Sequence, residues 1–232
     1  GEQFADKVLL RNNETLFSGE KVSTAKLGKA MVTAALLACE QAGAVRLEIG
    51  ERKGLFGLTK VQDLFAVPGS PSQPLPPHTL EAEFAGLAQQ WAPKNANTIY
   101  HILFYWLGRE SASPWFEAVE EIKRNMHQRG LLEAATSKRL KIFTVTTYSL
   151  PESTAALMRG QSPQGVKAML DNCQRTRPEI WKRMEKSIQK AISARTESSR
   201  GSMCRGERVG SPSSLAHTLP VPAGSTPSAT SL

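Results

Sequence analysis

The sequence is poor in the residues that build disulfide-linked or metal-bound folds. Its 232 residues include only three cysteines, and none stands at metal-site spacing from another cysteine or a histidine. An odd, scattered set of cysteines fits a reducing compartment better than a disulfide framework. The histidines are also isolated, and they are His78, His101, His127 and His217. The sequence therefore predicts no metal and no other cofactor.

Long apolar runs are also missing. The longest, around residues 30–38, is far shorter than the roughly 20 residues that a membrane-spanning helix needs. The first residues have neither the basic start nor the apolar stretch of a secretory signal peptide. We therefore expect a cytoplasmic protein whose contact with membranes, if any, is peripheral.

Motifs of known catalytic sites are lacking as well. The sequence has no Gly-x-Ser-x-Gly elbow and no His-Glu-x-x-His pair. Gly54-Leu-Phe-Gly57 resembles the Gly-x-x-Gly clamp of KH domains, but that clamp joins two helices and these glycines flank a predicted hairpin tip. We therefore expect a protein that is not an enzyme.

Positive charge, by contrast, is abundant. The net charge is +8 and the sequence pI is about 9.6. Between residues 138 and 197, twelve Lys and Arg stand against five Asp and Glu. Such a balance favours anionic partners, either phospholipid headgroups or nucleic acid, and does not choose between them. A basic face that is merely solvated is an equally weighted alternative.

The composition changes near residue 196. Residues 197–232 are rich in Ser, Pro and Gly and contain few large apolar residues. Such a segment buries too little surface to offset the entropy of ordering, so we predict that it is disordered. Residues 1–196 are predicted to form the folded domain.

The first regular elements form a helix, a glycine and a hairpin across residues 24–66. Ser23 or Thr24 can cap a helix that runs through Gln41, and Gly43 suits the left-handed position after it. Alternating apolar and polar residues then predict strands at 45–49 and 59–67 around a basic turn.

More helices are predicted downstream, after a proline-rich linker. Helices are expected from Thr79, over 95–107, and from Ser113-Pro114 to Gly130, where the serine would cap and the proline would start the helix. A strand at 141–149 follows, and then helices at 153–158, 163–173 and 178–195. The predicted class is mainly α (α+β): a compact helical domain with a projecting β-hairpin and winged-helix-like helix–hairpin units.

The last predicted helix is amphipathic. Its polar side carries four cations, and these are Lys182, Arg183, Lys186 and Lys190. A basic amphipathic helix can lie on an acidic membrane, but more often its apolar side simply packs on the domain core.

The predicted hairpin tip combines charge with apolar side chains. Leu55 and Phe56 closely follow Arg52 and Lys53. Apolar groups at an exposed tip are costly in water unless something covers them. They either fold back onto the domain, or enter a bilayer shallowly while the cations meet anionic headgroups.

Two stretches of the chain resemble the Golgi phosphoprotein 3-like family. One runs over residues 36–48 and on through the basic hairpin to Val67-Pro-Gly, and the other covers residues 125–132 and 142–151. Order and spacing are similar over roughly residues 4–175. The resemblance is to a divergent member of that family.

This resemblance implies a mostly helical domain with a projecting hairpin. Eukaryotic members of the family bind phosphatidylinositol 4-phosphate on Golgi membranes and also bind cytosolic tails of Golgi glycosyltransferases. Where the family has three headgroup arginines, this chain has Val32, Phe116 and Val119. The nearest cations are Lys26, Lys29, Arg124 and Arg129.

The hypothesis from sequence is therefore a non-catalytic peripheral membrane protein, located on the Golgi if the host is eukaryotic. It would bind anionic phospholipids. Further candidate partners are the cytosolic tails of membrane proteins and a second copy of the chain, bound through the hairpin. The candidate lipid-binding residues are Lys26, Lys29, Arg52, Lys53, Leu55, Phe56, Arg124 and Arg129.

The main alternative is a tandem winged-helix protein that binds nucleic acid. Against it, the helix at 24–42 is rich in Ala and Leu, and the helix at 114–129 carries Glu117, Glu120 and Glu121. A protein-interaction adaptor is a third possibility. Burial of the first helix would favour the membrane hypothesis, and its exposure would favour the winged helix.

Overall fold

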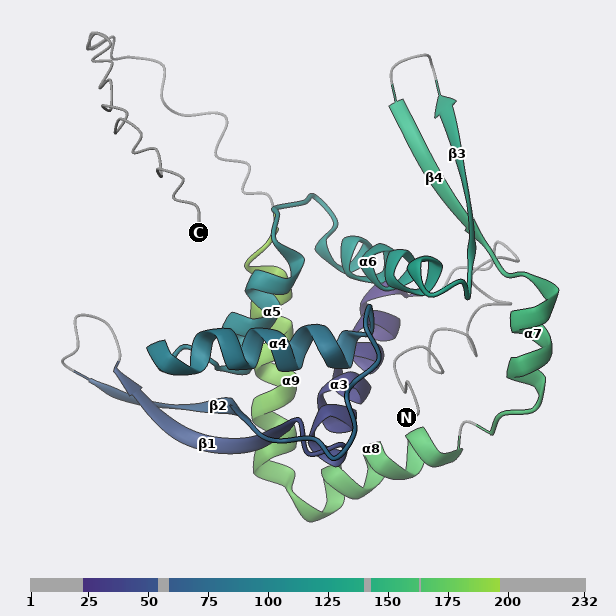
Figure 1. Cartoon of the computed structure of the whole chain (residues 1–232). Coiled ribbons are helices and arrows are strands. Elements are labelled where there is room, and N and C mark those ends of the chain that lie inside the picture. The colour runs from purple at the N-terminus through teal and green to yellow at the C-terminus, as the bar shows by residue number, and fades with distance from the viewer. Residues whose placement is uncertain (1–22, 54–58, 140–142, 163, 197–232) are drawn as a thin grey trace, which may run out of the picture. The chain divides into compact units, whose positions relative to one another are not determined.

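The fold is seen in a computed structural model, which describes residues 23–53, 59–139, 143–162 and 164–196 (Figure 1). All of these residues belong to one compact unit, Gly1–Glu197, and a second unit covers Ser198–Leu232. The predicted disordered tail, residues 197–232, therefore lies outside the described residues.

The described residues form seven α-helices, one 3₁₀ helix and two antiparallel hairpins. The mixed, mainly helical class predicted from the sequence is thus confirmed. The elements are α3 (Thr24–Gln41), β1 (Val45–Lys53), β2 (Lys60–Pro68), α4 (Leu80–Trp91), η2 (Ala92–Lys94), α5 (Ile99–Leu107), α6 (Pro114–Gln128), β3 (Glu133–Arg139), β4 (Phe143–Ser149), α7 (Glu152–Arg159), α8 (Gln164–Thr176) and α9 (Pro178–Ser193).

Helix α3 is the centre of the core. The Ser23 side chain accepts the Lys26 N–H at 3.4 Å, and Gly43 takes the left-handed conformation after the helix with a φ of 75°. Helices α4, α6, α8 and α9 pack around it. Small residues allow this close approach: a Cβ on Gly28 would lie 3.0 Å from Cε3 of Trp115 on α6. From Met31 to Cys39 every residue of α3 is buried.

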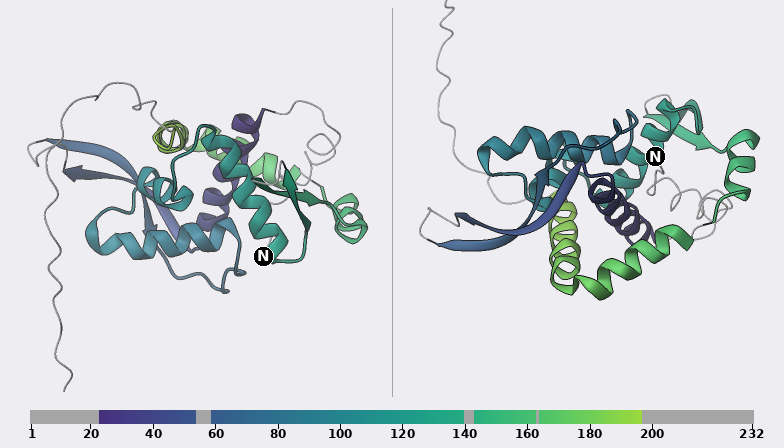
Figure 2. Two further views of the ribbon diagram at one scale, coloured as in Figure 1. Left: turned by 90° about the horizontal axis from the view of Figure 1, so that it is seen from above. Right: turned by 60° about the horizontal axis from the view of Figure 1, so that its bottom comes forward.

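The first hairpin is anchored at its base. Strands β1 and β2 pair from Val45↔Pro68 to Lys53↔Lys60. The inward side chains near the base are buried, and they are Val45, Leu47, Leu64 and Ala66. The other end of the hairpin extends away from the helices (Figures 1 and 2).

The outer edge of β2 is also covered at the base. The Ala66 N–H donates to the Asn97 carbonyl oxygen at 2.9 Å, and Asn97 Nδ2 donates back to the Ala66 carbonyl oxygen at 2.9 Å. Segment 97–98 therefore blunts the edge of the sheet just before α5 begins.

The second hairpin completes the prediction from sequence. A strand at 141–149 was expected within the predicted helix–hairpin units, but no bounds were predicted for its partner. Strand β3 is that partner and pairs with β4 from Glu133↔Ser149 to Arg139↔Phe143. Strand β3 lacks large apolar residues and is exposed from Glu133 to Lys138, so its sequence carries no alternating pattern. Like the first hairpin, the second follows a helix and a glycine in the left-handed conformation, since Gly130 has a φ of 74° after α6. The helix–glycine–hairpin unit thus occurs twice.

The start of α6 differs from the prediction in one respect. Pro114 is the first helical residue, as expected, but the Ser113 side chain forms no capping hydrogen bond. Instead, the Ser113 N–H donates to Ser111 Oγ at 3.0 Å. The proline alone starts this helix, since its fixed φ is already helical and it has no N–H to satisfy.

Two carboxylates tie the elements together. Glu83 of α4 accepts hydrogen bonds from Trp106 Nε1 at 2.8 Å and from Asn125 Nδ2 at 2.9 Å, and burial raises its pKa. Glu40 of α3 accepts the Leu47 N–H at 3.1 Å and both guanidinium amino groups of Arg177. Glu40 thereby joins the end of α3 to β1 and to the start of α9.

Candidate functional site

The two cations predicted at the start of the first helix, Lys26 and Lys29, differ in exposure and in ion pairing. Lys26 is exposed in the first turn of α3. Lys29 Nζ lies 3.0 Å from Glu185 Oε1 of α9, and both side chains are partly exposed. A Lys29 that is paired with a carboxylate is less available to a phosphate group than Lys26 is.

The two predicted arginines of α6 stand apart from those lysines. Gly28 of α3 packs on Trp115 in the first turn of α6, whereas the side chain of Lys29 pairs with Glu185 of α9. Arg124 comes nine residues after Trp115 on α6, which is roughly 13 Å along the helix axis. Arg129 follows the end of the helix and is half-buried. The structure therefore does not bring Lys26, Lys29, Arg124 and Arg129 into one site.

The cations of the first hairpin are largely neutralised by carboxylates. Arg52 Nε lies 2.8 Å from Asp63 Oδ2, and the pair is partly buried. Two further pairs, Arg46–Glu48 and Lys60–Glu51, are exposed. Among the described residues, Lys53 is exposed and forms no ion pair. The predicted tip residues Leu55 and Phe56 lie outside the described residues.

Two apolar side chains of this hairpin are exposed. Ile49, in the middle of β1, is 39% exposed, and Val61, near the distal end of β2, is 38% exposed. Ile49 pairs with Leu64 and Val61 pairs with Arg52, so the two side chains lie on opposite faces of the ribbon. Each face of the hairpin therefore exposes one apolar side chain, and Val61 adjoins the last pair, Lys53↔Lys60.

Helix α9 packs as the more common interpretation of its sequence predicted. Its apolar stripe faces the core, with Met184, Ile188 and Ile192 buried. Its basic side consequently faces outward. We call Lys182, Arg183, Lys186 and Lys190 the α9 cationic strip.

The α9 cationic strip runs between the first hairpin and α5. The Arg183 guanidinium donates to the Gln62 carbonyl oxygen of β2 at 3.2 Å and to its side-chain oxygen at 3.1 Å. Seven residues on, Lys190 Nζ lies 5.2 Å from the ring centroid of Tyr100 on α5. Lys186 is exposed between these two contacts, on the same side of the helix. The cations could be read from the sequence, but these neighbours could not.

Helix α5 carries an aromatic row beside this strip, formed by Tyr100, His101, Phe104 and Tyr105. Tyr105 is 43% exposed. Its ring stacks on Trp91 with 4.3 Å between centroids, and Lys94 Nζ lies 4.8 Å from the centroid of Trp91. Tyr100 therefore lies against the strip, whereas Tyr105, five residues on and about 140° around the helix, lies against Trp91 of α4.

His101 shows that the hairpin, α5 and α9 converge electrostatically. Its Nδ1 lies 2.9 Å from Thr98 Oγ1. Burial lowers its pKa, the charges of Arg52 and Lys190 lower it further, and Asp63 opposes them. A neutral imidazole at pH 7 follows from this direction of shift.

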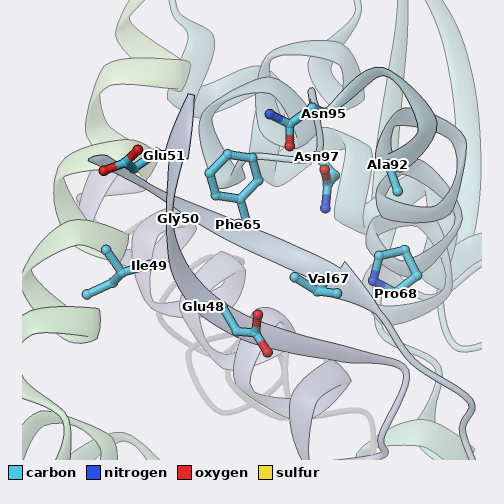
Figure 3. A pocket seen from close by; sticks show the side chains of 10 residues that line it. All are labelled: Glu48, Ile49, Gly50, Glu51, Phe65, Val67, Pro68, Ala92, Asn95 and Asn97. Atoms are coloured by element: carbon cyan, nitrogen blue, oxygen red, sulfur yellow. The ribbon is translucent and has the colours of Figure 1, made fainter. Parts of the chain in front are cut away.

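A shallow pocket of about 340 Å³ lies on the other side of the first hairpin (Figure 3). Phe65 occupies its middle, Asn95 and Asn97 lie on one side, and Glu48 lies on the other. Glu48 and Glu51 are the charged residues of the lining, and both are in ion pairs with neighbouring cations. The pocket therefore brings no cation toward an anionic ligand.

The described residues also bear on metal binding and on membrane spanning. No group of three or more His, Cys, Asp or Glu side chains among them could hold a metal ion. No helix in the described ranges is both long and apolar enough to cross a bilayer. Cys39 donates to the Glu81 carbonyl oxygen at 3.2 Å, and burial raises the pKa of its thiol. Cys39 thus belongs to the core of α3.

Comparison with protein-family models, with curated proteins and with solved structures finds no match for this chain.

Proposed function

We propose that the protein is a non-catalytic peripheral membrane protein that binds anionic phospholipids, of phosphoinositide type, through the end of its first hairpin. The observation that carries this proposal is the contrast within β1–β2. The base is buried in the core, while Ile49 in the middle of β1 and Val61 near the distal end of β2 are exposed, and the exposed Lys53 ends β1.

The chemistry of this end suits the surface of a bilayer. Apolar side chains gain by leaving water for the boundary of the acyl chains, and lysines gain from the negative potential of anionic headgroups. Leu55 and Phe56 come two and three residues after the end of β1 in the sequence and would add apolar groups to this contact. The anchored base supplies a rigid support for such an insertion.

The burial of α3 supports this function over a winged-helix one. A helix that reads a DNA groove has to present its side chains to the bases. Between Met31 and Cys39 the side chains of α3 are all in the core. On α6, the partly exposed Glu120 and Glu121 pair with Lys123 and Arg124, so these two cations are less available to phosphate groups.

The resemblance to the Golgi phosphoprotein 3-like family adds secondary expectations to this proposal. Cytosolic tails of membrane proteins, and a second copy of the chain bound through a hairpin, would be further partners. In a eukaryotic host the membrane would be that of the Golgi.

Liposome flotation tests the proposal. Recovery should be high on vesicles that contain phosphatidylserine or phosphatidylinositol 4-phosphate and low on neutral phosphatidylcholine vesicles. Phe56→Asp should lower recovery on the acidic vesicles about tenfold, because it places a charge at the inserted tip. Phe116→Asp is the matched control, since Phe116 lies on α6 and is 49% exposed.

Equal recovery on neutral and acidic vesicles, unchanged by Phe56→Asp, would contradict the proposal. A gel shift with duplex DNA tests the alternative, a winged-helix protein that binds nucleic acid. Binding that is tight at low salt and falls steeply with added salt would indicate phosphate contacts of a nucleic-acid-binding protein.

A further inference from the structure

The α9 cationic strip is the most concentrated charge next to the first hairpin. Among the residues that the structure describes, Lys182 and Lys186 form no ion pair, and both are exposed. They are one helical turn apart, and Lys190 is one turn further, so the three ammonium groups follow one line along α9. Helix α9 thus presents charge that no carboxylate in the described part of the chain neutralises.

The strip is held in place relative to the hairpin. The guanidinium of Arg183 donates hydrogen bonds to Gln62. Gln62 is the strand partner of Glu51, near the distal end of the ribbon. Because the base of the hairpin and the apolar stripe of α9 share one core, the strip has a fixed position relative to that base. Figure 1 shows α9 running past β2 and under α5.

We propose that the α9 cationic strip and the aromatic row of α5 form a second contact with the same anionic bilayer, and that this contact orients the protein while the hairpin end inserts. This inference rests on the proposed membrane binding and names the surface that meets the headgroups. The lysines supply the electrostatic attraction. The tyrosines supply rings with polar tips, which prefer the headgroup level.

The state of the aromatic rings favours a bilayer over single-stranded nucleic acid. Binding of bases requires free ring faces for stacking. Here Trp91 stacks on one face of Tyr105, Lys190 lies over one face of Tyr100, and the Arg195 guanidinium lies 3.5 Å from the centroid of Phe104. These contacts reduce the ring surface that a base could stack on, whereas a membrane interface needs only the edges and polar tips.

Neutralising two lysines of the strip tests the inference on the full chain. Lys182→Gln with Lys186→Gln should lower the partition coefficient on phosphatidylserine vesicles about thirtyfold, because each lysine near an anionic surface contributes independently. The matched control is Lys138→Gln with Lys167→Gln. These two lysines lie on β3 and α8, are exposed, and give the same change in net charge.

The outcomes separate this inference from the proposed function. If the unmodified protein does not float on acidic vesicles, the proposed function is wrong. If it floats and both double variants lose the same affinity, binding follows net charge, and the strip has no special role. If neither variant changes, the strip is also not the contact surface.

Binding of single-stranded nucleic acid to the α9 cationic strip, the alternative, is tested with the same variants. If the Lys182/Lys186 variant loses affinity for a single-stranded oligonucleotide but keeps its affinity for vesicles, the strip binds nucleic acid and the inference is overturned. Quenching of Trp91 by brominated lipids, taken as the difference between the parent and Trp91→Phe, should be present on acidic vesicles. Its absence would place α5 away from the bilayer and contradict the inference.

Discussion

The two hairpins of this protein begin alike and end differently. Each follows a helix that closes on a glycine with positive φ, Gly43 in the first and Gly130 in the second. Strands β1 and β2 then bury apolar side chains in the core, whereas β3 is exposed from Glu133 to Lys138. Figure 1 shows β3 and β4 standing away from the helices. The local unit therefore determines the turn, and the inward-facing residues determine whether the hairpin is anchored.

Anchoring has a functional consequence. A hairpin with a buried base can hold its other end in a fixed position against a membrane. The second hairpin has less to hold it: Tyr148 of β4 packs against the core near the base, but β3 is exposed from Glu133 to Lys138, and isolated two-stranded ribbons are marginal in water. The proposed membrane contact is therefore on β1–β2.

The largest effect expected from this difference is on stability. Leu64→Ala should lower the free energy of unfolding by about 2–5 kcal/mol, because it opens a cavity in the core beneath β2. Val145→Ala, at a half-buried position of β4, should cost less than about 1 kcal/mol. Urea unfolding of both variants measures this, and equal costs would show that the second hairpin is anchored as well.

The carboxylate of Glu40 should give the next largest effect. Glu40→Ala leaves the Leu47 N–H and the Arg177 guanidinium without their acceptor, which should cost about 1–3 kcal/mol. Glu48→Ala is the control, because the exposed Arg46–Glu48 pair should contribute less than about 1 kcal/mol. If the two variants unfold at the same urea concentration, Glu40 does not anchor the hairpin.

The glycines test the part that the two units share. Gly43→Ala and Gly130→Ala should each cost about 1–2 kcal/mol, since both force an alanine into the left-handed region. A Cβ at either position meets no atom closer than 3.7 Å, so backbone strain is the common cause. Clearly unequal costs in urea unfolding would mean that the two turns are not equivalent.

The smallest effect concerns acid stability beside the first hairpin. The folded-state pKa of His101 is lowered, so the unfolded chain binds more protons once the pH falls below about 6.5. This contribution to stability is present above that pH and is lost as the pH falls toward the folded-state pKa. His101→Gln should make the loss of stability between pH 7 and pH 5 less steep, as urea unfolding across that range can measure. An unchanged slope would contradict the burial of this imidazole.

Much of the fold could be predicted from local patterns. Helices α3 and α6 have clear starts and apolar stripes, and β1 alternates from Val45 to Ile49. Strand β3 could not be predicted, because an exposed strand of small and polar residues leaves no periodic signal. The Ser113 cap does not form because the ψ of Ser113, 69°, departs from the extended conformation of a capping residue, and sequence spacing does not show this angle.

The candidate site was harder to predict than the fold. The sequence identified cations at Lys29 and Arg52, but it could not show that carboxylates of other elements, Glu185 and Asp63, pair with them. It also identified the basic side of α9 without showing which elements lie next to it. Long-range ion pairs and neighbours depend on tertiary packing, which sequence spacing does not reveal.

Hydrogen exchange of the full chain, with and without phosphatidylserine vesicles, tests the central claim most directly. The account predicts slower exchange on binding in residues 48–63 and 182–193, and no change in residues 133–149. Protection of residues 133–149, with none in the first hairpin, would contradict it.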